Sequence, residues 1–223
     1  INNFEWKDVF YSNNNNLKNF TYNNENDLIF KSKKLTKNEI TNFTLFEDEN
    51  LITSDEKGNI IVLSVNKNEI ISKLKFYKKK LKKIKKSLNF IVEKNIIYAS
   101  DNIGYLYAYN YKLNKIIWGK NYKIPFRSNL KLSNDKLFLS NQNNDLYVIA
   151  KKTGSLLKLI PTEETSLKNR FKNNLSINNK SLFFLNTYGS LYSMDIKNLK
   201  LNWFINLNKT LDINPSNLFF GNQ

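Results

Sequence analysis

The chain has 223 residues, of which 41% are hydrophobic and 14% aromatic, with 35 Lys and Arg against 19 Asp and Glu and no Cys or His. This composition is typical of a globular chain, and it excludes Cys/His metal sites, histidine general bases and thiol nucleophiles. The formal net charge of +16 comes almost entirely from lysine, because arginine occurs only at positions 127 and 170.

The first 41 residues match no later part of the chain. Phe4 to Tyr11 and Leu28 to Lys31 could each form a strand, and Asn13 to Asn16 is a low-complexity loop. We interpret residues 1–41 as an N-terminal lead-in with a possible ring-closing strand, and a separate domain is the alternative. No signal peptide is visible, and no apolar run approaches the roughly 20 residues that span a membrane.

From residue 42 onward a four-stranded unit recurs, and it is clearest between Asn95 and Trp118. An apolar, β-branched strand at Ile96 to Ala99 leads into a tight turn at Asp101 to Gly104, and a second strand returns at Tyr105 to Tyr109. Asp accepts hydrogen bonds from the backbone of such a turn, and Gly adopts positive φ without a steric clash. The unit is therefore a β-meander.

The same turn residues recur at matching offsets along the chain. Aligned copies place a positive-φ residue at intervals of 46, 40 and 45 residues, with a side-chain acceptor three residues earlier. The positive-φ residues are Gly58, Gly104, Asn144 and Gly189, and the acceptors are Asp55, Asp101, Asn141 and Asn186. A β-sandwich has no reason to repeat such offsets, whereas about 40 to 46 residues is the period of a propeller blade.

The sequence thus predicts an all-β fold, a β-propeller of four-stranded antiparallel blades. The expected blades cover residues 42–78, 87–122, 129–161 and 173–207, and the start of another covers 213–223. Because propellers protect their sheet edges by closing into a ring, we expect these residues to be part of a longer chain with seven or eight blades.

The residues that end each blade carry a family resemblance. Ala108 to Trp118 resembles the A-x-D-x-x-x-G-K-x-x-W signature of PQQ-like (quinoprotein-like) propeller repeats, with Asn at the Asp and Gly positions. Asp195, Lys200 and Trp203 match the same signature, and Thr153-Gly154 matches its T-G pair. The degenerate pattern over residues 42–223 is most similar to the family of the outer-membrane β-barrel assembly lipoprotein BamB. The resemblance implies that Trp118 and Trp203 are buried between neighbouring blades and act structurally.

Similarity to BamB implies a non-catalytic scaffold for protein–protein interaction that supports outer-membrane β-barrel assembly in the periplasm. It implies no cofactor, and association with the outer membrane through a lipid anchor outside these residues. The alternative is a PQQ-dependent quinoprotein dehydrogenase, whose family pattern implies an adjacent cysteine pair and acidic Ca²⁺ ligands. This chain has no cysteine. Its adjacent carboxylates, Glu47 to Glu49 and Glu163-Glu164, are interpreted as solvated loop residues.

Alternating strand direction predicts which loops share a face. The connections between blades and the turns between second and third strands should lie on one side, which gathers Lys78 to Lys86, Ile124 to Arg127 and Pro161 to Lys172. Loops on a rigid scaffold often bind partners. We expect a protein partner here, a periplasmic domain of the barrel-assembly machinery, bound by Phe126, Arg127, Glu163, Glu164 and Arg170.

The two arginines offer a planar, bidentate guanidinium, and Phe126 offers an apolar anchor. The alternative remains open that Phe126 packs under its own loop and Arg127 pairs with a neighbouring blade. The run Lys78 to Lys86 has seven lysines in nine residues, and it is either a solvated connection or a site for an anionic partner. Nucleic acid is disfavoured because the aromatic residues fall at strand positions that are expected to be buried.

Overall fold

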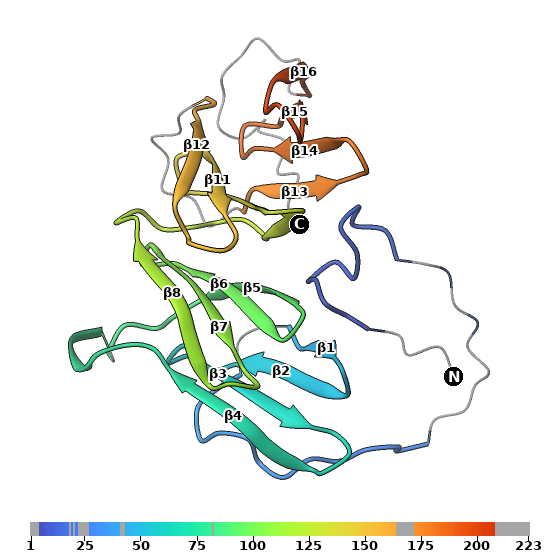
Figure 1. Cartoon of the computed structure of the whole chain (residues 1–223), viewed down its shortest axis with the longest axis vertical. Coiled ribbons are helices and arrows are strands. Elements are labelled where there is room, and N and C mark those ends of the chain that lie inside the picture. The colour runs from blue at the N-terminus through green and yellow to red at the C-terminus, as the bar shows by residue number, and fades with distance from the viewer. Residues whose placement is uncertain are drawn as a thin grey trace.

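Four antiparallel sheets of four strands each make up the regular structure of this computed structural model (Figure 1). The structure describes residues 5–17, 19, 21, 27–40, 43–81, 83–163 and 172–207. Within these residues the only helix is a single 3-10 turn, η1, at Lys79–Leu81. The predicted all-β architecture is confirmed as a partial β-propeller of about four blades.

Each blade is a meander in which consecutive strands pair. The first blade contains β1 (Leu45–Glu47), β2 (Asn50–Ser54), β3 (Asn59–Ser64) and β4 (Glu69–Lys75), and the second contains β5 (Leu88–Glu93), β6 (Ile96–Asp101), β7 (Tyr105–Asn110) and β8 (Lys115–Asn121). The third contains β9 (Lys131–Ser133), β10 (Lys136–Ser140), β11 (Leu146–Ala150) and β12 (Leu156–Ile160), and the fourth contains β13 (Asn174–Ile177), β14 (Ser181–Leu185), β15 (Ser190–Asp195) and β16 (Leu201–Asn206). The further blade expected at 213–223 lies outside the described residues.

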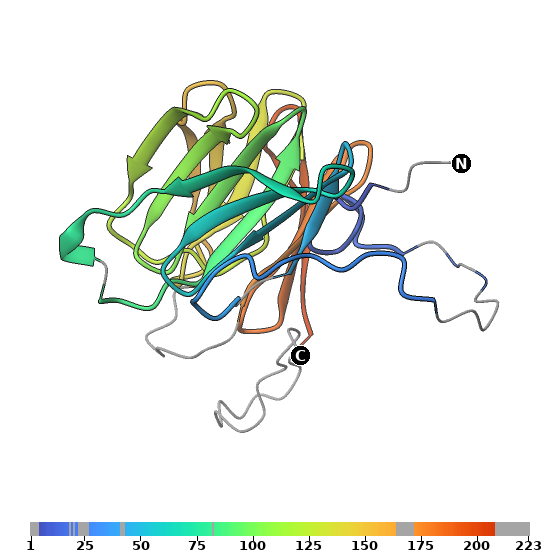
Figure 2. The same cartoon turned by 90° about the horizontal axis from the view of Figure 1, so that it is seen from below.

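The hydrophobic core lies between the blades. Three clusters of buried side chains fill the interfaces of the first blade with the second, the second with the third, and the third with the fourth. The middle strands contact a neighbour on both faces, which explains continuous apolar runs such as Ile60 to Leu63 in place of strict alternation. The outer strands β4, β8, β12 and β16 are mostly exposed and form the rim (Figure 2).

The N-terminal segment 5–17, which we call the strap, lies on the inner side of the arc of blades (Figure 1). Trp6 forms an isolated bridge with Phe46 of β1, and the Val92 amide of β5 donates to the Lys7 carbonyl at 3.0 Å. The Ile177 amide of β13 donates to the Asn13 carbonyl at 2.7 Å. The Asn13 side chain donates at 3.2 Å to the carbonyl of Leu132 in β9, so the strap contacts the inner strand of every blade.

The possible strands at Phe4 to Tyr11 and at Leu28 to Lys31 do not form within the described parts of those ranges, where the Trp6 bridge is the only ladder contact. Segment 27–40 instead runs beside the first blade (Figure 2). Its Thr36 and Asn38 side chains donate to the Asp55 carboxylate at 3.1 and 2.8 Å, which anchors the segment on the turn between β2 and β3.

Candidate functional site

We call the side of the molecule that carries the blade-to-blade connections and the β2–β3, β6–β7, β10–β11 and β14–β15 turns the loop face. Backbone hydrogen bonds join the connections to these turns. The amide of Phe126 donates to Asp101 at 3.0 Å, and the amide of Gln142 donates to Pro125 at 2.9 Å. The Lys86 amide donates to Glu56 at 2.9 Å. The Thr162 hydroxyl donates to the Asn144 carbonyl at 2.7 Å, so the described parts of the connections that the sequence groups on one side are joined to the turns there.

The repeated turn residues of the loop face serve the backbone. The Asp101 carboxylate accepts the amides of Ile103, Gly104 and Tyr105, each at 2.8 Å. The turn residues that follow the acceptors all have positive φ: 75° at Gly58, 101° at Gly104, 69° at Asn144 and 76° at Gly189. A Cβ on Gly104 would lie 2.8 Å from the Ile124 backbone, so only a residue without a side chain lets this turn pack against the next connection.

Phe126 lies in the core and not on the surface. Its side chain is 2% exposed, and its ring meets the rings of Tyr122 and Tyr147 edge-on, with centroids 5.6 and 5.5 Å apart. Phe126 packs under its own loop, which is the alternative that the sequence left open. Phe126 therefore stabilises the joint between the second and third blades and offers no exposed apolar anchor.

Glu163 is bound within the protein. Its carboxylate accepts hydrogen bonds from the Ser190 hydroxyl at 2.9 Å, the Asn186 amide at 2.7 Å and the Tyr192 hydroxyl at 2.8 Å. Burial, followed by this hydrogen bond and the negative charge of Glu163, raises the pKa of Tyr192 above its ordinary range. Glu163 thus fastens the end of the third blade to the fourth. Two further predicted partner residues, Glu164 and Arg170, lie outside the described residues.

Arg127 has a fixed backbone and a side chain without a partner among the described residues. Its amide donates to Ser140 at 3.0 Å, and its carbonyl accepts the Asn173 amide at 2.8 Å. Its guanidinium group forms no hydrogen bond or ion pair with any described residue, so only its backbone pairs with a neighbouring blade. The side chain lines a pocket of about 680 Å³, which we call the loop-face pocket. The other lining residues are Lys85, Lys86, Ser87, Asn89, Asn102, Phe126 and Lys172.

The lysine-rich connection is partly used by the fold. Lys85 forms ion pairs with Glu39 at 2.9 Å and with Glu56 at 3.6 Å. The Lys86 side chain is buried, and its ammonium group donates to the carbonyls of Leu81 and Ile84. These two lysines add positive charge beside the loop-face pocket, but their donors are already engaged.

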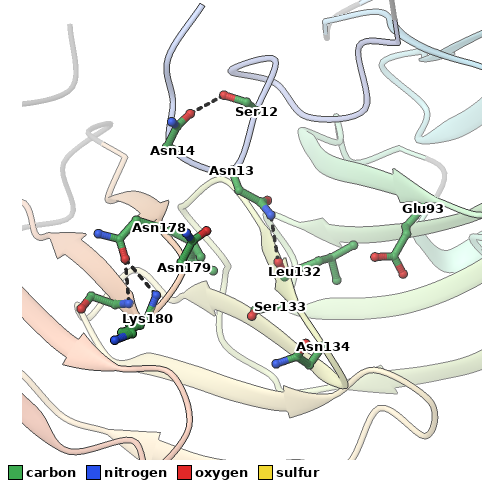
Figure 3. A pocket seen from close by; sticks show the side chains of 12 residues that line it. Ser12, Asn13, Asn14, Glu93, Leu132, Ser133, Asn134, Asn178, Asn179 and Lys180 are labelled. Carbon is green, nitrogen blue, oxygen red and sulfur yellow. Dashed lines mark hydrogen bonds between the residues drawn. The ribbon is translucent and has the colours of Figure 1, made fainter.

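A second pocket, of about 1050 Å³, lies on the opposite side of the molecule between the strap and the hairpins of three blades (Figure 3). Its walls are mainly amides and hydroxyls, including Asn13, Asn134 and Asn178. Its carboxylate, Glu93, is 2.6 Å from the ammonium of Lys151. Amides and a paired carboxylate can hold polar groups, but these lining residues include no nucleophile with an adjacent base.

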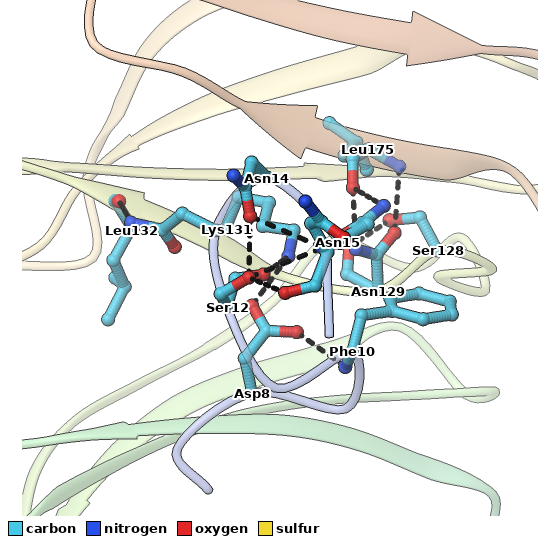
Figure 4. Close-up of polar contacts among 12 residues, drawn as sticks. Asp8, Phe10, Ser12, Asn14, Asn15, Ser128, Asn129, Lys131, Leu132 and Leu175 are labelled. Atoms are coloured by element: carbon cyan, nitrogen blue, oxygen red, sulfur yellow. Dashed lines mark hydrogen bonds and ion pairs between the residues drawn. The ribbon is translucent and has the colours of Figure 1, made fainter. Parts of the chain in front are cut away.

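A buried ion pair holds the strap on the blades (Figure 4). The Lys131 ammonium, whose side chain is 0% exposed, lies 2.6 Å from the Asp8 carboxylate and donates to the Ser12 carbonyl at 2.9 Å. Burial raises the pKa of Asp8, and the charge of Lys131 opposes that shift. The sequence does not reveal this pair, because a separation of 123 residues leaves no local pattern.

The two signature tryptophans have different surroundings. Trp118 is 8% exposed, and its indole N–H donates to the Lys151 carbonyl of the third blade at 2.9 Å. A Cβ on Gly154 would lie 2.4 Å from its ring, so the ring rests directly on the T-G turn. Trp203 was also expected to be buried between blades, but this is wrong for the described chain, where it is 42% exposed. Within the described residues, no further blade covers the outer face of β16.

No set of three or more Asp and Glu side chains is grouped as metal ligands within the described ranges. None of the described helical residues forms a helix long and apolar enough to cross a bilayer.

No family model and no curated protein sequence matches the chain, whereas solved structures resemble its fold. BamB from Moraxella catarrhalis is 11% identical with a TM-score of 0.64, over 79% of this chain and 52% of that one. The quinohemoprotein alcohol dehydrogenase ADHIIG from Pseudomonas putida HK5 is 10% identical with a TM-score of 0.68, over 91% of this chain and 40% of that one. The computationally designed Ika4 protein is 11% identical with a TM-score of 0.61, over 77% of this chain and 99% of that one.

The chain thus spans about half the length of the Moraxella BamB and two fifths of the dehydrogenase. At these identities the likeness concerns the fold. The expected resemblance to PQQ-like β-propellers is confirmed at that level, because BamB and the dehydrogenase share this fold.

Proposed function

We propose that the chain is part of a non-catalytic β-propeller scaffold that binds a partner protein on its loop face. The observation that carries this proposal is that two loop residues of the same face, Glu163 and Arg127, differ in whether the fold already binds their side chains. Glu163 is saturated by hydrogen bonds from the fourth blade, whereas Arg127 has a rigid backbone and a guanidinium without a partner among the described residues. A rigid loop that presents an unpaired, bidentate donor is suited to recognising a partner.

The role that we propose is BamB-like support of outer-membrane β-barrel assembly. The partner is then a periplasmic domain of the assembly machinery, and the protein is periplasmic and associated with the outer membrane through a lipid anchor outside these residues. The degenerate propeller signature and the fold shared with the Moraxella BamB support this proposal.

A quinoprotein dehydrogenase is the second candidate, favoured by the fold that the chain shares with the Pseudomonas dehydrogenase. The residues present do not fit the expected cofactor site. The chain has no cysteine pair, and its described carboxylates form no cluster of three ligands. Asp55 and Asp101 lie at equivalent blade turns, and their carboxylates already accept hydrogen bonds from turn amides and neighbouring side chains. The missing cysteine pair and the structural role of these carboxylates therefore favour the scaffold proposal over the dehydrogenase.

A capture experiment with the full-length protein and the periplasmic domain tests the scaffold proposal. The double variant Arg127→Glu/Arg170→Glu should reduce capture at least about tenfold, as expected when charged interface contacts are reversed. The melting temperature should stay nearly unchanged, because the Arg127 side chain has no described partner to lose. The charge-matched control is Lys115→Glu/Lys197→Glu, at exposed positions outside the loop face. Undiminished capture by the arginine variant would place the binding site elsewhere.

A further inference from the structure

We propose that the loop-face pocket is an anion site that takes the carboxylates of an acidic segment of a partner polypeptide. This inference rests on the proposed scaffold function and names the chemistry that the partner must present.

The pocket is built where three consecutive blades meet. Lys85 to Ser87 lead into β5, Phe126 and Arg127 precede β9, and Lys172 precedes β13. Asn102, on the β6–β7 turn, braces this wall, since its amide donates to the Lys85 carbonyl at 3.2 Å and its oxygen accepts the Ser87 amide at 3.0 Å. The Asn102 side chain therefore holds the backbone of this wall in place before any ligand binds.

Arg127 and Lys172 both line the pocket, and neither has a counterion among the described residues. Ser128 and Asn173 form a parallel bridge, and the Asn173 amide donates to the Arg127 carbonyl at 2.8 Å. The residues that precede this bridge, Arg127 and Lys172, are consequently neighbours, and both line the pocket. No carboxylate is among the described lining residues, so the repulsion between the two cations is left for a bound anion to relieve.

The polar lining groups that remain are donors suited to oxygen ligands. The Ser87 hydroxyl and the Asn89 amide form no side-chain hydrogen bond with the described residues, and both line the pocket with Arg127 and Lys172. A guanidinium can bind one carboxylate in a bidentate manner, and the ammonium can bind a second as a point charge. A volume of about 680 Å³ accommodates acidic side chains together with a short piece of backbone.

The same lining disfavours other anionic macromolecules. Single-stranded nucleic acid needs exposed aromatic faces for stacking, but Phe126, the aromatic residue among the described lining, is buried. A membrane surface calls for exposed apolar side chains beside the basic ones, and the described lining has none. A concave set of mixed donors fits the carboxylates of a polypeptide best.

Fluorescence anisotropy with the 223-residue chain tests the site. The probe is a labelled peptide of alternating Glu and Gly, and the control probe has Gln at each Glu position. The chain should bind the Glu peptide and not the Gln peptide. Arg127→Gln/Lys172→Gln should weaken binding about tenfold or more, and Arg127→Lys should weaken it less because charge remains but the bidentate fork is lost. Lys115→Gln/Lys197→Gln removes the same charge elsewhere and should change binding about twofold or less.

Equal losses in the pocket variant and the control variant would overturn the proposal, because binding would then reflect diffuse positive charge. Pocket-dependent binding of an oligothymidine or of phosphatidylglycerol vesicles, without binding of the Glu peptide, would also overturn it. The capture experiment separates this inference from the proposed function. Capture through Arg127 without peptide binding would refute the anion site alone, and pocket-dependent peptide binding without capture would refute the assembly role alone.

Discussion

Trp118 and Trp203 occupy matching positions in the outer strands of the second and fourth blades. Trp118 pairs with Ala108 and Trp203 pairs with Ser193, and a register shift immediately follows each partner. The strand geometry is therefore alike at both sites. The third blade covers Trp118 with a backbone acceptor and a glycine, whereas no described residue gives Trp203 an equivalent packing surface.

Truncation of the two tryptophans should have different costs. Trp118→Ala leaves a cavity at a blade interface and an unused acceptor on Lys151, so it should lower the free energy of unfolding by about 3 to 5 kcal/mol. Trp203→Ala, at an exposed strand position, should change it by about 1 kcal/mol or less. Urea unfolding of both variants measures the difference, and the two variants serve as controls for each other. Equal costs would show that Trp203 also has a covering surface in solution.

The strap is the element that connects the inner strands of all four blades. Its backbone pairs with β1, β5 and β13, and its Asn13 and Asn15 side chains donate to carbonyls of β9 and β13. The Asp8–Lys131 pair is the buried charge contact in this network (Figure 4). Removing one member of such a pair leaves an uncompensated charge in a dry site.

The pair can be tested by single and double substitution. Lys131→Met should lower the free energy of unfolding by about 3 to 5 kcal/mol, since it leaves the Asp8 carboxylate buried without its counterion. Adding Asp8→Asn should restore most of this loss, because the side-chain oxygen that accepts the Phe10 amide is kept and the charge is removed. Denaturant unfolding measures both effects. Hydrogen exchange at the Val92 and Ile177 amides, which donate to the strap, should accelerate in the single variant. Unchanged exchange there would mean that the pair does not hold the strap.

Phenol groups link one blade to the next across the propeller. The Tyr77 hydroxyl donates to Asp101 at 2.5 Å, and the Tyr111 hydroxyl donates to Glu47 at 3.1 Å, which joins the first and second blades. Burial and the nearby carboxylates raise the pKa of Tyr77 and Tyr111 above their ordinary range. Burial, then the charge of Glu93, raises the pKa of Tyr98 to about 12.

These shifts predict alkaline unfolding. The fold favours the neutral phenol, so the contribution to stability is fully present below the ordinary tyrosine pKa of about 10 and is lost as pH rises toward 12. Tyrosinate absorbance and the strand signal in circular dichroism should therefore change together above about pH 10. Tyr111→Phe, which removes one ionisable link, should move this transition to higher pH. Ionisation of all tyrosines near their ordinary pKa with the fold intact would contradict the prediction.

The blade turns are the features that the sequence predicts best, because their stabilising contacts are local. These contacts lie within a few residues, as when Asp101 accepts three amides at positions 103 to 105. The same holds for the positive φ of Gly58, Gly104 and Gly189. The apolar runs before and after these turns were enough to predict strands, and the repetition of the turn predicted the propeller.

Burial and side-chain pairing depend on what packs against a residue, so they could not be predicted from local sequence. Phe126 and Arg127 are adjacent in the chain, but one fills a blade joint and the other lines a pocket. Glu163 is saturated because the fourth blade brings three donors to it, and Lys131 is paired because the strap brings Asp8 across 123 residues. Trp203 matches the same signature as Trp118 but remains exposed. The signature places a tryptophan on the outer strand, and the neighbouring blade must be present to bury it.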